Sequence, residues 1–535
     1  MSGSPRRQRP PGASPSLTTA THDGSARTTL PAHPPANSGP AEASPLEKKG
    51  QQLSQVAQNM SHGRVLQDLP QDILRYIHSL LPLQDAARAA CVSRGFVQFW
   101  RCTLGLTDME FVRREINFMD KVDQILENHH NNGVLVEILE LEYPPSRNTK
   151  PCYLDRWLQI TVKPGTKELD FSMCVTGREE ENYSFPCLVL SDEAAASSIQ
   201  SLSLSACSIH PTSTLGLLRK LTSLHLDLVH TTEEGLGNLL SKSCALERLD
   251  LWFCSGINCL RIPSTMQNLK FLDIIECQRL KVVEINASNL CFLRCVGADN
   301  LTEISARNSS QLKKVILSRV LLSYAHAWLP SIARNAESLT LRCPTENVNF
   351  SSMPSNLLHL KKLDIGLSQP TMAAFCTSYD VFSLLSFIDA SPVLDSFFLK
   401  VEKNALKDDL DMGDENNKYL GRKLERRHVC LRRVDIMGFC ASKGLVELTI
   451  NILENAPSLE RLTLDTIYGY NRCLGTFHKC TTSTKTIQCS PLSKADLAGA
   501  RRGVEVAGRY IVGRVPSYVQ LEVLDPCNRC NTGEW

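Results

Sequence analysis

The sequence has no long apolar run: none approaches the roughly 18 consecutive residues that a membrane-spanning helix needs. Its first residues lack the apolar stretch of a secretory signal, so we expect no export signal. It also lacks an excess of charge of either sign, because 58 basic residues are balanced by 56 acidic ones. The composition therefore predicts no membrane partner and no nucleic-acid partner.

Motifs of common enzyme classes are also missing. The sequence contains no G-x-x-x-x-G-K-[ST] phosphate loop, no H-E-x-x-H zinc motif and no G-x-S-x-G nucleophile turn. The neighbours His129 and His130 stand in no context that suggests a catalytic triad, and His129 to Gly133 is typical of a turn that ends a helix. We expect a non-enzymatic protein with no catalytic residue and no cofactor.

The 21 cysteines follow no regular spacing. Without an export signal, they indicate reduced thiols in a cytoplasmic or nuclear protein. Cys527-x-x-Cys530 could be half of a zinc site or a redox pair. Its plausible complement is Cys473, His478, Cys480 and Cys489. Because these gaps do not fit a standard finger, we predict no metal site.

Residues 1–62 are rich in proline, serine, alanine, glycine and threonine. Such a segment has too little apolar surface to offset its ordering entropy, so we predict a disordered tail. The basic residues in it are Arg6, Arg7, Arg9, Lys48 and Lys49, among others. They could form a nuclear-import signal, but the cluster is short and a solvated tail is the favoured interpretation.

The segment Asp68–Cys102 has the pattern of three short helices. Pro70 suits a first helical turn, and Pro82 ends the first helix because the residue before a proline avoids the α region. Asp85 can cap a second helix and Ser93 a third. So short a segment buries little apolar surface by itself, so we expect it to bind a partner.

This segment resembles an F-box, for which we expect the boundaries 63–104. The resemblance is carried by Leu69-Pro70, Ile73-Leu74, Ile77, Leu81-Pro82-Leu83, Asp85-Ala86-Ala87, Val92-Ser93-Arg94 and Trp100-Arg101. It implies docking on a Skp-type adaptor and, through it, on a cullin-based ubiquitin ligase. The implied adaptor contacts are Leu69, Pro70, Ile73, Leu74, Ile77, Leu81, Pro82, Leu83, Val92 and Trp100. Phe96 departs from the tryptophan of many F-boxes but keeps an aromatic ring. A helical hairpin from a larger helical domain is the alternative.

After the F-box, the spacing of apolar residues changes from a helical period to the alternation of strands. Residues 105–132 are expected to be a helical linker, with a helix from Asp108 to His129. Short strands are then predicted at Val134–Tyr143, Arg156–Val162, Lys167–Met173 and Pro186–Asp192.

From residue 199 onward the sequence repeats L-x-x-L-x-L, the strand signature of a leucine-rich repeat. Copies begin at Ile199, Leu221, Leu246, Leu269, Leu290, Leu312, Ala336 and Leu360. Wider-spaced copies begin at Leu394, Leu431 and Leu459. We therefore predict an α/β fold in which residues 133–429 form a solenoid with one parallel strand per repeat. The charged segment Lys403–His428 is expected to be a loop.

Cys207, Cys254 and Cys277 each lie three residues after the last apolar position of their repeat. This is the Asn/Cys position of the motif, which holds a small buried side chain. One thiol per turn does not converge on a tetrahedral metal site, so we predict a structural role.

Residues that alternate with the leucines should face the concave surface. The position between the second and third apolar residues is occupied by Ser203, His225, Asp250, Asp273, Asp364 and Asp435. We predict that the four aspartates form an acidic file that receives a partner protein through a basic or mixed segment. Arg248, Trp252 and Phe271 lie nearby in the sequence. An ordinary solvated strand face is an equally good interpretation.

Residues 430–530 resemble the FBD region that follows the repeats in a large plant family of F-box proteins. The region predicts a helix at Leu445–Leu453 and a strand at Leu459–Leu464, which together would cap the solenoid. Residues 531–535 would be a tail.

Together these resemblances imply the substrate-recognition subunit of a Skp–cullin–F-box ubiquitin ligase, with an unknown target protein held by the repeats. Two alternatives remain open. One is a repeat scaffold that acts outside a ligase, and the other is an F-box receptor that senses a small molecule.

Overall fold

The computed structural model divides the chain into two units, residues 1–69 and 70–535. The described residues are 69–70, 73–74, 76–77, 81, 83–92, 96, 103–107, 118–143, 151–173, 183–297, 300–319, 322–344, 357–368, 381–402, 406, 424, 426–467 and 493–526. The predicted tail, most of the predicted loop 403–428 and the candidate zinc residues lie outside this set.

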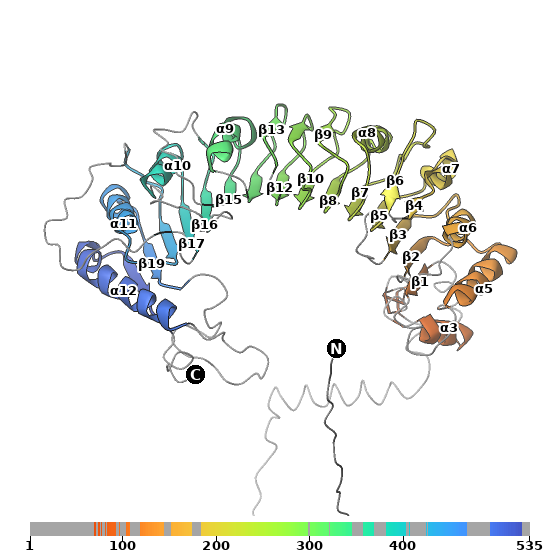
Figure 1. Ribbon diagram of the computed structural model, residues 1–535, viewed down its shortest axis with the longest axis horizontal. Helices are drawn as coiled ribbons and strands as arrows, with labels where there is room; N and C mark the ends of the chain where they lie inside the picture. Colours follow the sequence, from red (N-terminus) through yellow and green to blue (C-terminus); the bar gives the residue numbers. More distant parts are fainter. Residues whose placement is uncertain are drawn as a thin grey trace, which may run out of the picture. The chain divides into compact units, whose positions relative to one another are not determined.

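The described residues form one sheet of 15 strands, each paired in parallel with its neighbours (Figure 1). Its strands are, in order, β1 Thr103–Thr107, β2 Ile138–Tyr143, β3 Glu168–Met173, β5 Ser201–Ser205, β7 Ser223–Asp227, β8 Arg248–Trp252, β10 Phe271–Ile275, β12 Phe292–Val296, β14 Lys314–Ser318, β15 Ser338–Pro344, β16 Lys362–Ser368, β17 Ser396–Val401, β18 Arg433–Met437, β19 Arg461–Asp465 and β20 Gln520–Leu524. This arrangement confirms the predicted leucine-rich repeat solenoid.

Helices and short strands return the chain from one strand to the next. The helices are α3 Leu83–Val92, α5 Phe118–Asn131, α6 Pro151–Thr161, α7 Glu193–Ala196, α8 Glu233–Ser241, α9 Leu322–Ile332, α10 Leu385–Asp389, α11 Lys443–Asn455 and α12 Lys494–Tyr510, with 3-10 turns η4 Cys187–Leu190, η5 Val381–Leu384 and η7 Val512–Arg514. Two smaller sheets comprise β9 Cys259–Ile262, β11 Val282–Ile285 and β13 Glu303–Ala306, and β4 Ser184–Phe185 with β6 Ser208–Ile209. In Figure 1, α8, β9, β13 and α9 all lie on one side of the large sheet.

The register of the large sheet puts equivalent residues of successive repeats side by side. Leu249 of β8 pairs with Leu272 of β10, and both are fully buried. The residues that alternate with them point to the other face. We call this face the open face. It is formed by the first, middle and last residues of each five-residue strand core, which in β8 are residues 248, 250 and 252.

The turns after five strands of the large sheet share a left-handed conformation. The residues concerned are Ala206, Leu228, Phe253, Glu276 and Arg319, with φ between 49° and 60°. Each N–H donates to a carbonyl at or near the end of the neighbouring strand, as Leu228 does to Trp252 O at 2.8 Å and Glu276 to Val296 O at 2.7 Å. Backbone hydrogen bonds at the strand ends thus offset a conformation that ordinary side chains avoid.

The predicted cysteine positions are confirmed as structural. Cys207, Cys254 and Cys277 are buried in the described fold. The Cys254 thiol donates to Leu226 O at 3.3 Å and the Cys277 thiol to Leu251 O at 3.4 Å. Each of these two thiols therefore bonds to the backbone of a preceding strand.

Two of the predicted strands are wrong. Arg156–Val162 lies in α6, because Leu154, Trp157 and Leu158 recur at helical spacing and are almost fully buried. The Trp157 indole N–H also donates to Asp123 of α5. The central part of Pro186–Asp192 forms the 3-10 turn η4, Cys187–Leu190. Strand β2 confirms the C-terminal part of the predicted strand Val134–Tyr143, and β3 confirms all but the first residue of Lys167–Met173.

The region after the F-box also differs from expectation. The sheet already begins with β1, at the junction of the predicted F-box and the predicted helical linker. Helix α5 confirms the second half of the predicted helix. It ends at Asn131, Gly133 in the following turn has a φ of 60°, and Val134 N–H donates to His129 O at 2.9 Å. The predicted helix-ending turn is thus confirmed.

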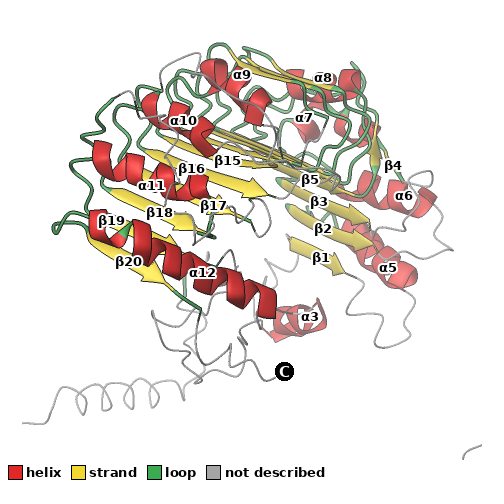
Figure 2. Cartoon of the chain, turned by 60° about the vertical axis from the view of Figure 1, so that its left-hand side comes forward, coloured by secondary structure: helices red, strands yellow, loops and turns green. Residues whose placement is uncertain are grey.

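The C-terminal elements continue the solenoid. Helix α11 and strand β19 confirm the predicted helix and strand. The additional helix α12 then leads to the edge strand β20, which it contacts (Figure 2). A capping box starts α12, since Ser493 and Asp496 satisfy each other's backbone N–H groups.

Candidate functional sites

The F-box segment presents apolar side chains on its surface. Ile73 is 43% exposed, Tyr76 63% and Val92 86%. Pro70 is also exposed, and its carbonyl accepts a hydrogen bond from Leu74 N–H at 3.0 Å. Exposed apolar groups on a small helical unit are typical of a protein-binding surface.

Other predicted adaptor contacts are less accessible. Leu69, Ile77 and Leu81 are half-buried, whereas Leu74 is 8% exposed. The side chains of Pro82, Leu83 and Trp100 lie outside the described residues. Sequence reasoning missed Tyr76, although its position three residues after Ile73 places both on one face of the helical segment.

The small apolar core of the F-box segment includes Leu74, Ala86 and Phe96, all buried. None of the three belongs to the hydrophobic cluster that runs through the repeats from Val122 to Val519. Phe96, the departure from the usual F-box pattern, therefore serves as a core residue.

The middle positions of the open face form a continuous row in the strand register. The row comprises Glu140, Asp170, Ser203, His225, Asp250, Asp273, Arg294, Ile316, Thr340, Asp364, Phe398, Asp435, Thr463 and Glu522. All four predicted aspartates belong to it, as do His225 and the unpredicted Arg294. Arg248 and Phe271 occupy first positions, and Trp252 occupies a last position.

The predicted aspartates are largely buried and have cationic partners. Arg294 Nε donates to Asp273 at 2.7 Å, and the second guanidinium nitrogen bonds to the other carboxylate oxygen. The Asp273 side chain is only 6% exposed. A carboxylate this deeply buried needs such a bidentate partner.

The other aspartates are paired in a similar way. Asp364 contacts Arg342 at 2.9 Å and Lys400 at 3.2 Å. Asp435 accepts two hydrogen bonds from Arg433, at 2.6 and 2.9 Å. The acidic residues of the row thus hold neighbouring cations in place.

Asp250 has the weakest ion pairs of the four. It lies 3.8 Å from both Arg248 and His225. Burial raises the pKa of its carboxyl, against the lowering effect of Arg248. The His225 ring also packs edge-on against Trp252, with ring centroids 4.7 Å apart.

Aromatic rings lie beside cations at two places on the open face. The first aromatic–cation cluster is Arg248, Phe271, Phe292 and Lys314 on β8, β10, β12 and β14. Arg248 lies 4.5 Å from the centre of the Phe271 ring, and Lys314 lies 5.5 Å from that of Phe292. The two rings are 6.2 Å apart.

A second aromatic–cation cluster consists of Lys362, Phe398 and Arg433. The two cations lie 4.9 and 5.3 Å from the centre of the Phe398 ring. Sequence reasoning missed Phe292, Lys314 and Lys362 because it read the first positions only in β8 and β10. It missed Phe398, a middle position, because it followed the aspartates there.

An acidic patch lies near the other end of the open face. It comprises Glu140 and Glu142 of β2 and Glu168 and Asp170 of β3. Burial, together with the charges of Asp170 and Glu168, raises the pKa of Glu140. The open face is therefore acidic at β2 and β3, whereas the aromatic–cation clusters lie on later strands of the solenoid.

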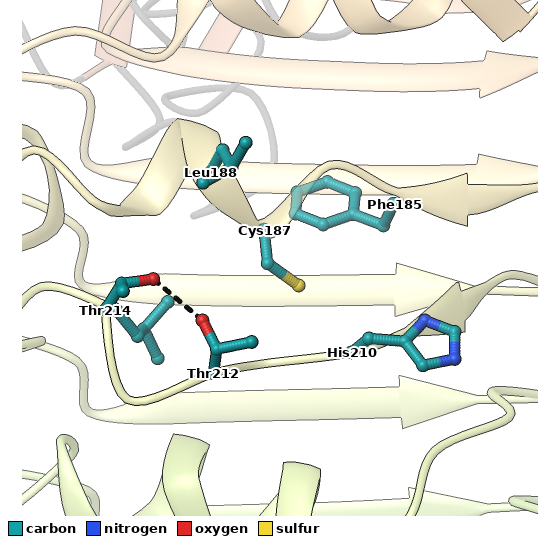
Figure 3. A pocket seen from close by; sticks show the side chains of 7 residues that line it. Phe185, Cys187, Leu188, His210, Thr212 and Thr214 are labelled. Atoms are coloured by element: carbon teal, nitrogen blue, oxygen red, sulfur yellow. Dashed lines mark hydrogen bonds between the residues drawn. The ribbon is translucent and has the colours of Figure 1, made fainter.

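A small pocket of about 210 Å³ lies between η4 and the segment after β6 (Figure 3). It contains Cys187 and His210, a pair that could suggest nucleophilic catalysis. Burial raises the pKa of the Cys187 thiol, and the His210 ring contacts the Ser184 hydroxyl at 3.5 Å. The thiol is therefore not activated as a nucleophile would be.

No group of three or more potential metal ligands occurs among the residues that the structure describes. Within the same residues, no helix has both the length and the apolar character required to cross a bilayer.

Comparison with known proteins identifies two regions. Residues 66–102 match the F-box domain, and residues 125–528 match the family described as At1g61320/AtMIF1, LRR domain. The second match extends through the FBD-like region, whose own resemblance stays a prediction. No curated protein matches the chain.

Solved structures with some similarity include two repeat proteins. An internalin from Listeria monocytogenes is 12% identical over 52% of this chain and 76% of its own, with a TM-score of 0.19. The ectodomain of the receptor kinase GASSHO1/SCHENGEN3 from Arabidopsis thaliana is 14% identical over 62% of this chain, with a TM-score of 0.19. This chain covers only 38% of that ectodomain. Since the family match spans most of the sequence, the chain belongs to the At1g61320/AtMIF1 leucine-rich repeat family and carries an F-box domain ahead of the repeats.

Proposed function

We propose that this protein is the substrate-recognition subunit of a Skp–cullin–F-box ubiquitin ligase. The observation that carries the proposal is the F-box at residues 66–102, which exposes Ile73, Tyr76 and Val92. F-box domains generally bind Skp-type adaptors. The repeats that follow offer a long open face to a target protein.

In this proposal the chain itself performs no chemistry. The adaptor links it to a cullin and a charged ubiquitin carrier, while the open face holds the target. Tethering both on one chain raises the effective concentration of the target's lysines near the activated ubiquitin. We place this activity in the cytoplasm, the nucleus or both, as expected for a chain whose cysteines stay reduced.

Co-purification of the full chain with a Skp-type adaptor tests the proposal. The double variant Leu69→Ala/Pro70→Ala should reduce adaptor binding by more than about tenfold, because it removes apolar contacts at the start of the F-box. Val92→Asp should have a similar effect through a charge placed at an exposed apolar position.

Val429→Asp is the matched control, since Val429 is 60% exposed and lies outside the F-box. It should bind the adaptor like the unchanged chain. Full adaptor binding by the double variant and by Val92→Asp would overturn the proposal. Failure of the unchanged chain to bind any Skp-type adaptor would instead favour a repeat scaffold that acts outside a ligase.

A further inference from the structure

The open face between β8 and β18 carries more positive than negative charge. Its cations are Arg248, Arg294, Lys314, Arg342, Lys362, Lys400 and Arg433, and its acids are Asp250, Asp273, Asp364 and Asp435. The acids are at most 13% exposed, whereas Arg248 and Arg433 are 46% and 48% exposed. Solvent therefore meets cations, while the carboxylates lie beneath them.

Two of these cations, Lys314 and Lys362, have no carboxylate partner among the described residues. Asp250, Asp273, Asp364 and Asp435 engage the arginines and Lys400. Lys314 and Lys362 are exposed, and within the described part of the chain neither forms an ion pair. Each instead lies beside a phenylalanine ring. An ammonium group in this position keeps most of its charge available to a ligand.

The rings beside these lysines are half-buried, so they offer apolar area next to charge. Phe271 and Phe292 form one such area and Phe398 the other. Aromatic and arginine side chains are the groups that most often dominate binding energy at protein interfaces. A fitting partner must supply carboxylates for the lysines and apolar side chains for the rings.

We infer that the open face from β8 to β18 binds an acidic segment of the target protein, in which aspartates or glutamates alternate with aromatic or aliphatic side chains. This inference rests on the proposed role of the repeats in holding a target, and it names the chemistry of that target. Lys314 and Lys362 receive the carboxylates, and the two aromatic–cation clusters receive the apolar groups. Electrostatic attraction of this kind sets specificity and the rate of association.

Peptide binding to the full chain tests the inference without the adaptor. The probes are a short fluorescent peptide in which aspartates and glutamates alternate with phenylalanines and leucines, its twin with every acid replaced by lysine, and a single-stranded oligonucleotide of similar length. We expect the acidic peptide to bind at least about tenfold more tightly than its twin. Its binding should weaken as salt concentration rises.

The double variant Lys314→Glu/Lys362→Glu should bind the acidic peptide about tenfold or more weakly than the unchanged chain, and it should bind the lysine twin more tightly. Lys281→Glu is the matched control, because Lys281 is exposed and precedes β11 in the smaller sheet. It should leave peptide binding unchanged. Thermal melting of each variant checks that the solenoid remains folded.

Equal affinity for the two peptides, or an acidic peptide that the double variant still binds normally, would overturn the inference. Tighter binding of the oligonucleotide would also overturn it, because the cations would then serve a phosphate backbone. Acidic-peptide binding by a chain that captures no Skp-type adaptor would sustain this inference while removing the ligase role.

Discussion

At the scale of single residues, the buried thiols show how burial controls chemistry. Burial raises the pKa of Cys207 to about 12 and that of Cys295 to about 12, from an ordinary value of 9.0. Both thiols therefore stay protonated in the folded protein under conditions where the unfolded chain would ionise them. They act as small apolar side chains.

This difference predicts a loss of stability at alkaline pH. Because the folded pKa lies above the unfolded value, the contribution of each thiol is complete below about pH 9 and declines as pH rises toward 12, by up to about 1.4 kcal/mol per pH unit. Urea unfolding across this range should show a shallower decline for Cys207→Ala/Cys295→Ala than for the unchanged chain. The exposed Cys244, replaced by alanine, is the control. Identical pH slopes for all three chains would contradict the prediction.

At the scale of strands, the ion pairs of the open face join neighbouring repeats. Asp273 of β10 and Arg294 of β12 are 21 residues apart in the sequence and directly opposite in the register. Loss of the cation would leave a carboxylate that is 6% exposed without its strongest partner. The pair therefore helps to fix the register of the two repeats.

We expect Arg294→Ala to destabilise the protein by about 1–3 kcal/mol. This is less than the loss for a fully buried ion pair, because solvent partly screens the exposed Arg294. Asp273→Ala in the same chain should restore part of the loss, because no carboxylate then remains unpaired. Urea unfolding of both single variants and the double variant measures the coupling. Strictly additive effects would show that the pair contributes no specific interaction. Lys313→Ala, which removes an exposed surface pair, should have no measurable effect.

The sequence predicted the strands of the repeats well and their surface chemistry only in part. Leucine spacing located the strands of the large sheet from β5 to β19, but not the smaller-sheet strands between them, because each large-sheet strand buries two apolar residues against the return segments. It failed at α6, where the apolar residues Leu154, Trp157 and Leu158 also fit a helix once α5 lies beside it. The aspartates were located correctly, but their partners lie on the same or neighbouring strands. Only the register brings Arg342 and Lys400 to Asp364.

At the scale of the whole molecule, the buried F-box residues that the structure describes lie outside the core of the repeats. Leu74, Ala86 and Phe96 do not join the cluster that extends from Val122 to Val519. Coupling between two binding sites requires a shared element with two arrangements, and these described residues share no hydrophobic cluster with the repeats. We therefore expect the two sites to act independently.

The affinity of the full chain for a Skp-type adaptor should change by less than about twofold when the acidic peptide saturates the repeats. Calorimetry of adaptor binding, with and without the peptide, measures this directly. The lysine twin, which should not bind, controls for ionic strength. A change of about tenfold in either direction would show that the target site and the F-box communicate.

The regular register of the sheet also sets a length scale for the target. Parallel strands lie about 4.8 Å apart, so Lys314 of β14 and Lys362 of β16 are separated by roughly 10 Å. An extended chain that crosses the strands advances about 3.3 Å per residue, so side chains on one of its faces are two positions, or about 6.6 Å, apart. Two acids at this spacing can both reach the lysines, whose long side chains span the remaining few ångströms, whereas adjacent acids point to opposite faces and cannot. The spacing of acids along a target is thus a property that this surface could distinguish, in addition to their number.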